Sequence, residues 1–186
     1  LVLTHYDQDH INGVTALLNR LPVKTLLLPD AEDPGKAGFA VLTAAEAHGA
    51  EVRYIRRPTS LSLGTADLTV YPPLGTEGDN ERGLAVLCTA GDFDLLITGD
   101  MNAATERLLL ERYALPDTEV LVVGHHGSKY STSNDLLEAL TPETSIISVG
   151  SNSYGHPADE TLRRLVESGA AICRTDKQGT IHLTVN

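Results

Sequence analysis

The stretch LVLTHYDQDHINGV, residues 1–14, places a dense group of ionisable side chains directly after an apolar run. Leu1, Val2 and Leu3 predict the end of a buried strand. Two histidines and two aspartates then follow at positions 5, 7, 9 and 10. Crowded carboxylates repel one another unless a cation or protons neutralise them, so the segment predicts a divalent metal site. A polar turn that only caps a helix is the competing interpretation, and it explains so many potential ligands poorly.

The alternating spacing of this segment predicts how its side chains converge. Residues i, i+2 and i+4 of an extended chain share one face, so His5, Asp7 and Asp9 are expected to point the same way. His10 then reaches the same point through a turn, which Asn12 and Gly13 permit.

The bulk composition is typical of a globular protein with a single domain, residues 1–186. The chain has 186 residues, of which 41% are hydrophobic, and it contains no low-complexity tract. No apolar run approaches the length of a membrane span, and no signal peptide is visible. Because the sequence starts inside an expected strand, we expect that it continues a longer protein upstream of Leu1. The formal net charge of −11 argues against a broad basic nucleic-acid-binding face. It does not exclude a nuclease, because bound metals and local Lys or Arg side chains attract phosphate.

Apolar periodicity alternates between strand-like and helix-like segments, which predicts one α/β domain. The expected helices cover residues 14–21, 37–48, 103–113, 133–140 and 158–169. The expected strands cover residues 23–30, 51–55, 84–90, 93–100, 144–150, 170–175 and 180–185, with a hairpin over 61–73 and a strand that starts at 120 and runs into a polar loop. A turn over 176–179 is expected to join the last two strands.

Two further strands stop abruptly at acids or histidines, as the first one does. Asp100 ends LLITGD, and His125 and His126 follow VLVVG; His156 lies in a similar loop, SNSYGHP. Strand ends along one edge of an α/β sheet are where such proteins place their chemistry. Mixed imidazole and carboxylate ligands suit Zn, Mn or Fe better than Ca or Mg, and the lack of Cys disfavours a structural zinc. An aspartate such as Asp100 can bridge two metals through its two oxygens, which predicts metal-assisted hydrolysis.

The ordered motifs HYDQDH, TGD, GHHGS and YGHP resemble the metallo-β-lactamase superfamily, whose signature is H-x-H-x-D-H followed by single ligands at later strand ends. The aspartate at position 7, together with LITGD, VGHHGSKYSTS and ISVGSNSYGHP, is similar to the metallo-β-lactamase-like domain of the ComEC family of DNA-uptake proteins. This resemblance covers Leu3 to Ile181. It implies an αββα sandwich that lacks its first strands, and a metal-dependent hydrolase.

The resemblance also implies a set of metal ligands for two divalent ions, Mn or Zn. It places His5 and Asp7 at a first metal and Asp9 and His10 at a second metal. Asp100 is implied to bridge them.

The later histidine ligand of the superfamily falls on the His125-His126 pair. Neighbours in an extended segment point in opposite directions, so one of the two is expected to bind metal. Similarity to the phosphorylcholine-esterase branch favours His126. His125 and His156 are then expected to face the phosphate or donate a proton, and Asp9 is expected to orient the attacking water.

The expected substrate contacts are Asn80, Ser128 and Lys129, of which Lys129 suits a phosphodiester best. A solvated loop with helix capping is the competing interpretation for Ser128 and Lys129, and a simple turn is the competing one for Asn80. Several other cations are expected to be ordinary solvated charges, with a basic track as the alternative: Arg163, Arg164, Arg174 and Lys177.

Two departures from the superfamily pattern affect these expectations. One histidine is missing between the first motif and Asp100, where only His48 occurs, inside an expected helix, and Tyr71 stands near the expected position. The first metal site is therefore expected to be weaker, which favours Mn over Zn. The missing first strands would expose a sheet edge and favour a homodimer.

The resemblance implies a nuclease that degrades the DNA strand that is not taken up. It further implies single-stranded DNA and a membrane channel domain of the same parent protein as partners, on the extracytoplasmic side of the cytoplasmic membrane. Two other functions stay open. One is hydrolysis of a lactone, thioester, choline phosphate or β-lactam; the other is a non-catalytic DNA-binding or gating module with a degenerate metal site.

Overall fold

The computed structural model describes residues 1–30, 34–75 and 80–185. Its helices are α1 (Gln8–Ile11), α2 (Val14–Leu18), α3 (Gly35–Ala47), α4 (Ala103–Arg112), α5 (Asn134–Leu140), α6 (Asp159–Glu167) and α7 (Thr175–Gln178), with 3₁₀ turns η1 (Asn80–Arg82) and η2 (Gly124–Gly127). Its strands are β1 (Thr25–Pro29), β2 (Glu51–Ile55), β3 (Thr59–Leu63), β4 (Ala66–Tyr71), β5 (Ala85–Ala90), β6 (Phe93–Ile97), β7 (Val120–Val122), β8 (Thr144–Ile147) and β9 (Ala171–Arg174).

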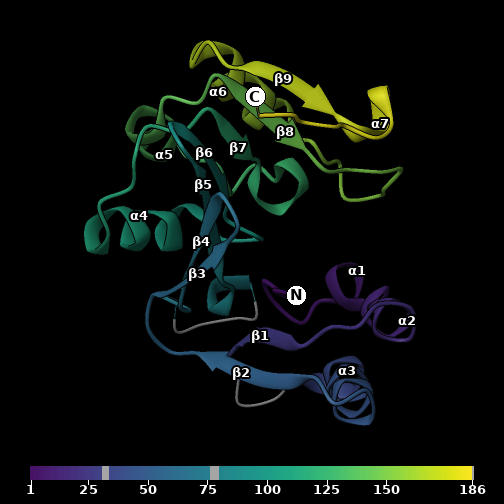
Figure 1. The fold of residues 1–186 in the computed structure, drawn as a ribbon. Coiled ribbons are helices and arrows are strands. Elements are labelled where there is room, and N and C mark those ends of the chain that lie inside the picture. The colour runs from purple at the N-terminus through teal and green to yellow at the C-terminus, as the bar shows by residue number, and fades with distance from the viewer. Residues whose placement is uncertain (31–33, 76–79, 186) are drawn as a thin grey trace.

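The strands form two sheets that lie between two layers of helices (Figure 1). The small sheet pairs β1 with β2 in parallel, and Val2 bridges to Leu27 beside it. The large sheet has the order β3-β4-β5-β6-β7-β8-β9, antiparallel from β3 to β6 and parallel from β6 to β9. The expected αββα sandwich is confirmed.

Successive side chains of a strand point to opposite faces of its sheet. Each sheet can therefore pack against helices on one face and against the other sheet on its opposite face, which gives four layers. In β1, Leu26 and Leu28 pack with the helices of the first half of the chain, whereas Leu27 packs between the two sheets. In β6, Leu96 joins the core under α4 and α5, whereas Ile97 packs between the sheets. Each of these fully buried leucines contributes about 1.5–3 kcal/mol relative to an exposed one.

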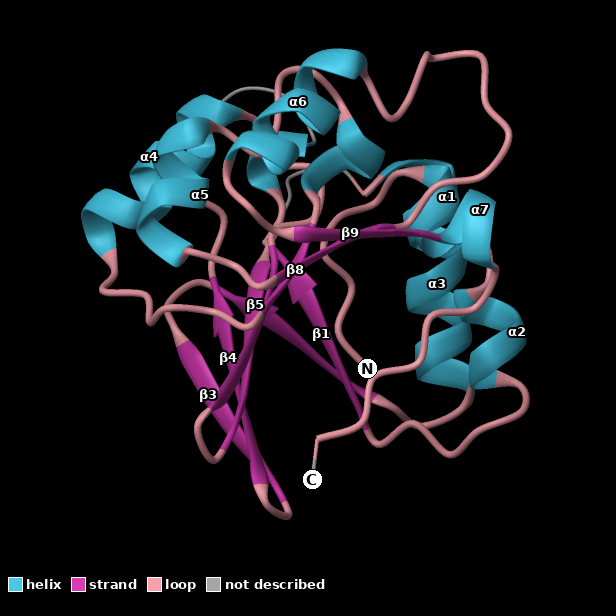
Figure 2. Ribbon diagram, turned by 90° about the horizontal axis from the view of Figure 1, so that it is seen from above, coloured by secondary structure: helices cyan, strands magenta, loops and turns pink. Residues whose placement is uncertain are grey.

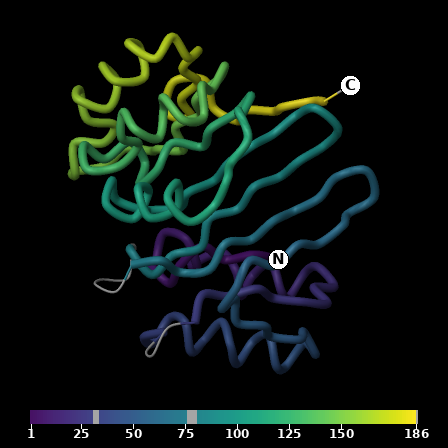
Figure 3. Tube along the Cα trace, turned by 90° about the vertical axis from the view of Figure 1, so that its left-hand side faces the viewer, coloured from purple at the N-terminus to yellow at the C-terminus, as the bar shows by residue number. Residues whose placement is uncertain are grey.

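The views from other directions show how the chain is divided between the layers. Helices α4, α5 and α6 lie together on one side, and α1, α2 and α3 lie on the other (Figure 2). The first part of the chain, in purple and blue, lies below the hairpins of the large sheet, and the green to yellow part lies above them (Figure 3). Within the described ranges 1–30, 34–75 and 80–185, no helix has the length and apolar character that crossing a membrane requires.

Three expected elements differ in the structure. The helix expected over 14–21 covers only Val14–Leu18, and a separate turn, α1, precedes it. The strand expected over 180–185 is wrong, because this segment has no strand pairing in the part of the chain that the structure describes. Most of the residues expected to make a tight turn form the helical turn α7 instead, whereas a hairpin needs a short turn of matching twist.

Candidate metal centre

The site lies where the ends of β6 and β7 meet the first residues of the chain. The amide of Leu84 donates to the carbonyl oxygen of Thr4 at 2.8 Å, and the amide of His125 donates to that of Gly99 at 3.0 Å. Gly99 has a φ of +58°, and a Cβ there would lie 3.1 Å from the Cβ of Thr4. This close approach requires glycine, and it brings the N-terminal segment against the residue that precedes Asp100.

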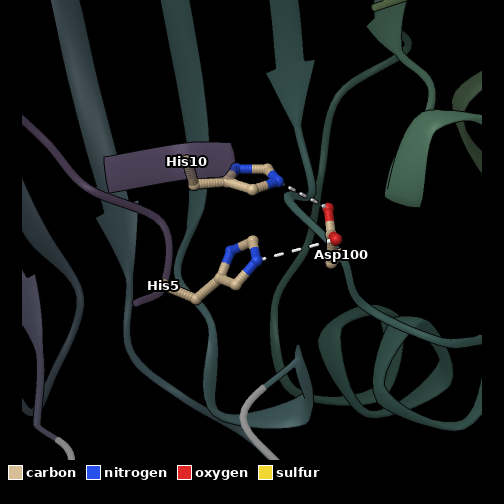
Figure 4. Close-up of side chains that lie close together, drawn as sticks. All are labelled: His5, His10 and Asp100. Atoms are coloured by element: carbon tan, nitrogen blue, oxygen red, sulfur yellow. Dashed lines mark ion pairs between the residues drawn. The ribbon is translucent and has the colours of Figure 1, made fainter. Parts of the chain in front are cut away.

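A first group of ligand atoms gathers around one oxygen of Asp100. The Nε2 atom of His5 lies 3.6 Å from Asp100 Oδ2 and 3.7 Å from Asp7 Oδ2. His5 and Asp100 are buried, at 1% and 4% exposure, whereas Asp7 is partly exposed. Figure 4 shows His5 and His10 pointing from the N-terminal segment toward the two oxygens of Asp100.

A second group gathers around His10. Its Nε2 atom lies 3.3 Å from Asp100 Oδ1 and 3.8 Å from Asp9 Oδ2. His126 Nε2 lies 3.3 Å from His10 Nε2 and 3.0 Å from Asp9 Oδ2. The two oxygens of Asp100 therefore face different groups, which is the arrangement that a bridging carboxylate requires.

The expectation that His5, Asp7 and Asp9 share one extended face is wrong. The extended backbone ends at Asp7, with φ −64° and ψ 145°, and α1 begins at Gln8. The amide of His10 donates to the carbonyl oxygen of Asp7 at 2.9 Å. Asp9 and His10 therefore approach the site from a helical turn, and the segment divides its ligands between the two groups.

The expectation that His125 and His126 point in opposite directions from an extended segment is also wrong. Both lie in η2 with left-handed backbone angles, φ +50° and +54°. His125 Nε2 lies 3.5 Å from Asp100 Oδ2, the oxygen that also faces His5. The turn thus brings each imidazole to a different group.

The hydrogen bonds of His126 decide which of its nitrogens can bind a cation. Its Nδ1 atom lies 2.7 Å from the carbonyl oxygen of Ser148. A carbonyl oxygen can only accept, so Nδ1 donates to it, and Nε2 is the nitrogen that faces Asp9 and His10. A partner on the far nitrogen is the usual means of orienting a metal-binding imidazole.

The charges of the cluster shift the pKa values of its members in opposite directions. Burial favours the neutral form of Asp100, but the neighbouring imidazoles of His10 and His5 outweigh burial and lower the pKa of Asp100 far below its usual range. Burial favours the neutral form of His10 as well, and here the hydrogen bond to Asp100 and the charges of Asp100, Asp9 and Asp7 outweigh it and raise the pKa of His10. The site therefore carries negative charge that attracts positive charge.

The residues present fit divalent metal ions. The ligand atoms of His5, His10 and Asp100 all lie within 4.8 Å of one another, and so do those of Asp9, His10 and His126. Two ligands of one tetrahedral zinc lie roughly 3.4 Å apart, given bond lengths of about 2.0–2.1 Å. The buried Nε2 atom of His5 has no hydrogen-bond partner among the described residues, so it is free to bind a cation.

A cavity of about 830 Å³ lies beside the two groups. Asp9, Asp100 and His126 line one side, and the loop 148–156 lines another. His156 lies in this loop with its ring centroid 5.5 Å from that of His125. Burial, followed by the charges of His125 and His126, lowers the pKa of His156. His156 therefore lies beside His125 in the cavity lining, and its catalytic role stays a prediction.

Other expected contacts lie away from the cavity. Ser128 is buried, and its carbonyl oxygen accepts a hydrogen bond from Thr161 Oγ1 at 2.8 Å. The Nζ atom of Lys129 lies over the ring of Tyr130, 5.0 Å from its centroid. Neither Ser128 nor Lys129 is among the described residues that line the cavity. The backbone of Asn80 lies in η1, and its side chain is outside the described part of the structure, so this contact stays a prediction.

Tyr71 does not replace the missing histidine. It is buried at the end of β4, and its ring packs against that of Tyr113, with centroids 4.7 Å apart. Among the described residues, His125 is the best candidate for the missing ligand, because its Nε2 atom faces Asp100 Oδ2, the same oxygen that His5 faces.

Sequence reasoning missed three residues that support the site. Asn152 holds the loop 148–156 through hydrogen bonds to its backbone, which the turn preference of Asn in SNSYG could have indicated. Glu106 accepts hydrogen bonds from the amides of Thr132 and Ser133. Arg164 was expected to be a solvated charge, but its guanidinium donates to the carbonyl oxygens of Lys129, Ser131 and Thr132. No local sequence signal marks Glu106 or Arg164, since their partners lie far along the chain.

Comparisons with known proteins agree with this architecture. A sequence profile of the metallo-beta-lactamase superfamily matches residues 1–151. ComE operon protein 3 of Bacillus subtilis is 33% identical over 184 residues, which is 97% of this chain and 24% of that protein. Competence protein ComA of Neisseria gonorrhoeae is 28% identical over 183 residues, again 97% of this chain and 24% of that protein.

Among solved structures, the diiron β-hydroxylase CmlA from Streptomyces venezuelae has the same fold, with a TM-score of 0.64 and 18% identity over 95% of this chain and 43% of that one. The chain spans about a quarter of the length of the two curated relatives named above. The resemblance to the ComEC family of competence proteins is confirmed. Because the superfamily profile covers most of its length, this chain belongs to the metallo-β-lactamase superfamily.

Proposed function

We propose that this chain is a metal-dependent phosphodiesterase that cleaves single-stranded DNA and degrades the strand that is not taken up. The observation that carries the proposal is Asp100, whose two oxygens face His5 and His10 separately at 3.6 and 3.3 Å. This arrangement supports a pair of divalent ions, Mn or Zn, held by His5, Asp7, Asp9, His10, Asp100 and His126. Such ions, when bound, supply an activated water and neutralise charge at phosphorus.

Asp9, His125 and His156 have separate catalytic tasks in this proposal, and Asp9 has this task in addition to holding a metal ion. Asp9 is exposed on the open side of the cluster, where its carboxylate accepts a hydrogen bond from the attacking water and orients it. His125 donates a proton to the leaving oxygen. His156 has a lowered pKa, so near pH 7 it donates a hydrogen bond to the phosphate more readily than a proton.

The similarity to competence proteins supports DNA as the substrate. The match covers 97% of this chain for the relative named a competence protein. The same resemblance supports a parent protein with a membrane channel domain, and a place for this domain on the extracytoplasmic side. The homodimer stays a prediction.

One observation favours a second function. Tyr71 lies in the core and does not replace the missing histidine, so the first metal group has one ligand fewer than the superfamily pattern provides unless His125 binds there. A chain with a weak first site would act as a DNA-binding or gating module without catalysis.

A nuclease assay separates the two functions. Metal-stripped protein is mixed with Mn, Zn or Mg and with end-labelled single- or double-stranded DNA, and Asp100→Ala is the control, with circular dichroism to verify its fold. We expect Mn-dependent cleavage that Asp100→Ala abolishes. Full activity of Asp100→Ala would refute the mechanism. Salt-dependent binding of single-stranded DNA without cleavage in any metal would establish the binding module.

Two additions to this assay test the substrate and the role of His125. Turnover of bis-p-nitrophenyl phosphate without DNA cleavage would favour a small diester as the substrate. His125→Ala should retain its metal content and lose turnover if His125 is a proton donor. Loss of metal from this variant, measured by elemental analysis, would make His125 a ligand instead.

A further inference from the structure

Tyr154 combines an exposed ring with a place in the wall of the metal-site cavity. Its side chain is 83% exposed, the largest fraction among the large hydrophobic residues of the described chain. Single exposed hydrophobic residues are common and need no explanation by themselves. Tyr154 differs because it lines the same cavity as Asp100 and His126.

The backbone of Tyr154 is held in place by Asn152. The Oδ1 atom of Asn152 accepts hydrogen bonds from the amides of Tyr154 and His156, both at 3.1 Å. Its Nδ2 atom donates to the carbonyl oxygens of Gly150 at 2.9 Å and His156 at 2.8 Å. An ordered ring loses less entropy when a ligand binds, so this loop is suited to present the tyrosine.

The ring of Tyr154 continues a row of aromatic side chains that ends at the metal groups. It stacks on His156, with centroids 6.0 Å apart and planes 24° apart. His156 in turn meets His125 edge to face, with centroids 5.5 Å apart, and His125 Nε2 lies 3.5 Å from Asp100 Oδ2. One face of the tyrosine is thus supported by an imidazole, and the exposed ring is free to receive another flat ring.

The charges of the cavity show why a phosphodiester substrate needs such a contact. The described lining residues include Asp7, Asp9 and Asp100 but no Lys or Arg, and the chain as a whole has a formal net charge of −11. A polyanion therefore gains no affinity from basic side chains at this wall. Stacking of a base on an aromatic ring does not depend on charge, and it does not depend strongly on sequence.

We propose that Tyr154 is a stacking platform for one nucleobase of a single-stranded nucleic acid, and that it positions the neighbouring phosphate at the metal groups. This inference rests on the proposed nuclease function and adds a residue that binds and positions the substrate at the same site. Bases in a duplex are stacked on one another and are not available to the ring, so Tyr154 selects single strands. A stacked base changes affinity by roughly 5- to 150-fold.

The test compares Tyr154→Ala and Tyr154→Phe with the wild-type protein on an end-labelled single strand. Phe39→Ala removes an exposed aromatic ring from α3, away from the cavity lining, and serves as the matched control. We expect Tyr154→Ala to raise KM roughly 5- to 150-fold with a smaller change in kcat, and Tyr154→Phe and Phe39→Ala to behave like the wild type. An unchanged KM for Tyr154→Ala would overturn the proposal.

A strand of abasic residues separates stacking from support of the loop. Wild type and Tyr154→Ala should cleave it equally, because it offers no base to the ring. An equal loss for Tyr154→Ala on the abasic and the normal strand would show that the tyrosine only maintains the loop, and would overturn the platform.

A binding experiment distinguishes failure of this inference from failure of the proposed function. A fluorescent methylphosphonate single strand carries bases but no backbone charge, and its binding is followed by anisotropy. We expect Tyr154→Ala to weaken its binding roughly 5- to 150-fold, whether or not the protein cleaves DNA. Equal binding by both proteins would refute the platform while leaving the nuclease assay to decide the function.

Discussion

Glu106 offers the sharpest test of how the loop after the histidine pair is held. This residue of α4 is fully buried, and its Oε1 and Oε2 atoms accept hydrogen bonds from the amides of Thr132 at 2.5 Å and Ser133 at 2.9 Å. Arg164 holds the same loop from the other side through the carbonyl oxygens of Ser131 and Thr132. The hydrogen bonds from both backbone amides depend on one carboxylate, because Glu106 supplies both acceptor oxygens.

We expect Glu106→Ala to lower the free energy of unfolding by about 2–4 kcal/mol. Each buried donor left without a partner costs about 1–3 kcal/mol. The amide of Thr132 is buried and that of Ser133 is only partly buried, so water recovers part of the second loss. Glu106→Gln keeps one acceptor and should lose about 1–2 kcal/mol. A loss of this size is a substantial part of the ~5–15 kcal/mol by which a typical domain is stable.

Urea denaturation followed by circular dichroism at pH 7 measures these differences. Glu111→Ala, on the exposed side of the same helix, is the matched control and should change stability by less than about 0.5 kcal/mol. A loss below about 1 kcal/mol for Glu106→Ala would contradict this role of Glu106, because it would mean that the two amides find other partners at no cost.

Three further predictions concern the metal groups, the histidine turn and pH. Adding Mn or Zn at a hundred times its Kd should stabilise the protein by about 2.7 kcal/mol in thermal denaturation, and an equal gain for Asp100→Ala would contradict the proposed ligand set. Gly127→Ala should cost about 1–3 kcal/mol in urea, because φ there is +86° and the new Cβ would lie 2.5 Å from that of Pro157. Gly150→Ala, which meets no atom within 4 Å, is its control and should be close to neutral. Burial outweighs the hydrogen bonds from Ser133 and Thr132 and raises the pKa of Glu106 above its ordinary value of 4.5. Between the unfolded and the raised folded pKa the native state binds more protons, so the free energy of unfolding should fall as pH rises through this window. In denaturation of the metal-free protein from pH 4.5 upward, the free energy of unfolding should fall less with pH for Glu106→Gln than for the wild type. Equal falls for both proteins would contradict the assignment of this pH dependence to Glu106.

Several features of this protein were predictable from sequence because they depend on neighbouring residues. The continuous apolar runs of β1 and β6 predict strands that are buried on both faces, and the packing of their leucines on both sides agrees with this. The polar residues that follow Leu1–Leu3, β6 and β7 predicted where the candidate ligands gather, since strand ends lie together at one edge of a sheet. The structure brings His5, His10 and Asp100 together there, and their role as metal ligands stays a prediction until metal binding is measured.

Periodicity and strand-end motifs are local properties, so the α/β class and the composition of the candidate site could be predicted from the amino-acid sequence, whereas the layered architecture was implied by the resemblance to the superfamily. Three features depend on the tertiary structure: both His125 and His126 turn toward the cluster, Ser128 is buried, and the described segment 180–185 pairs with no strand. It also decided the support of the site, since the Glu106 and Arg164 contacts join residues 26 to 35 positions apart. The physical reason is that a buried polar group takes whichever partner the packed chain brings within hydrogen-bonding distance, and no local pattern records that choice.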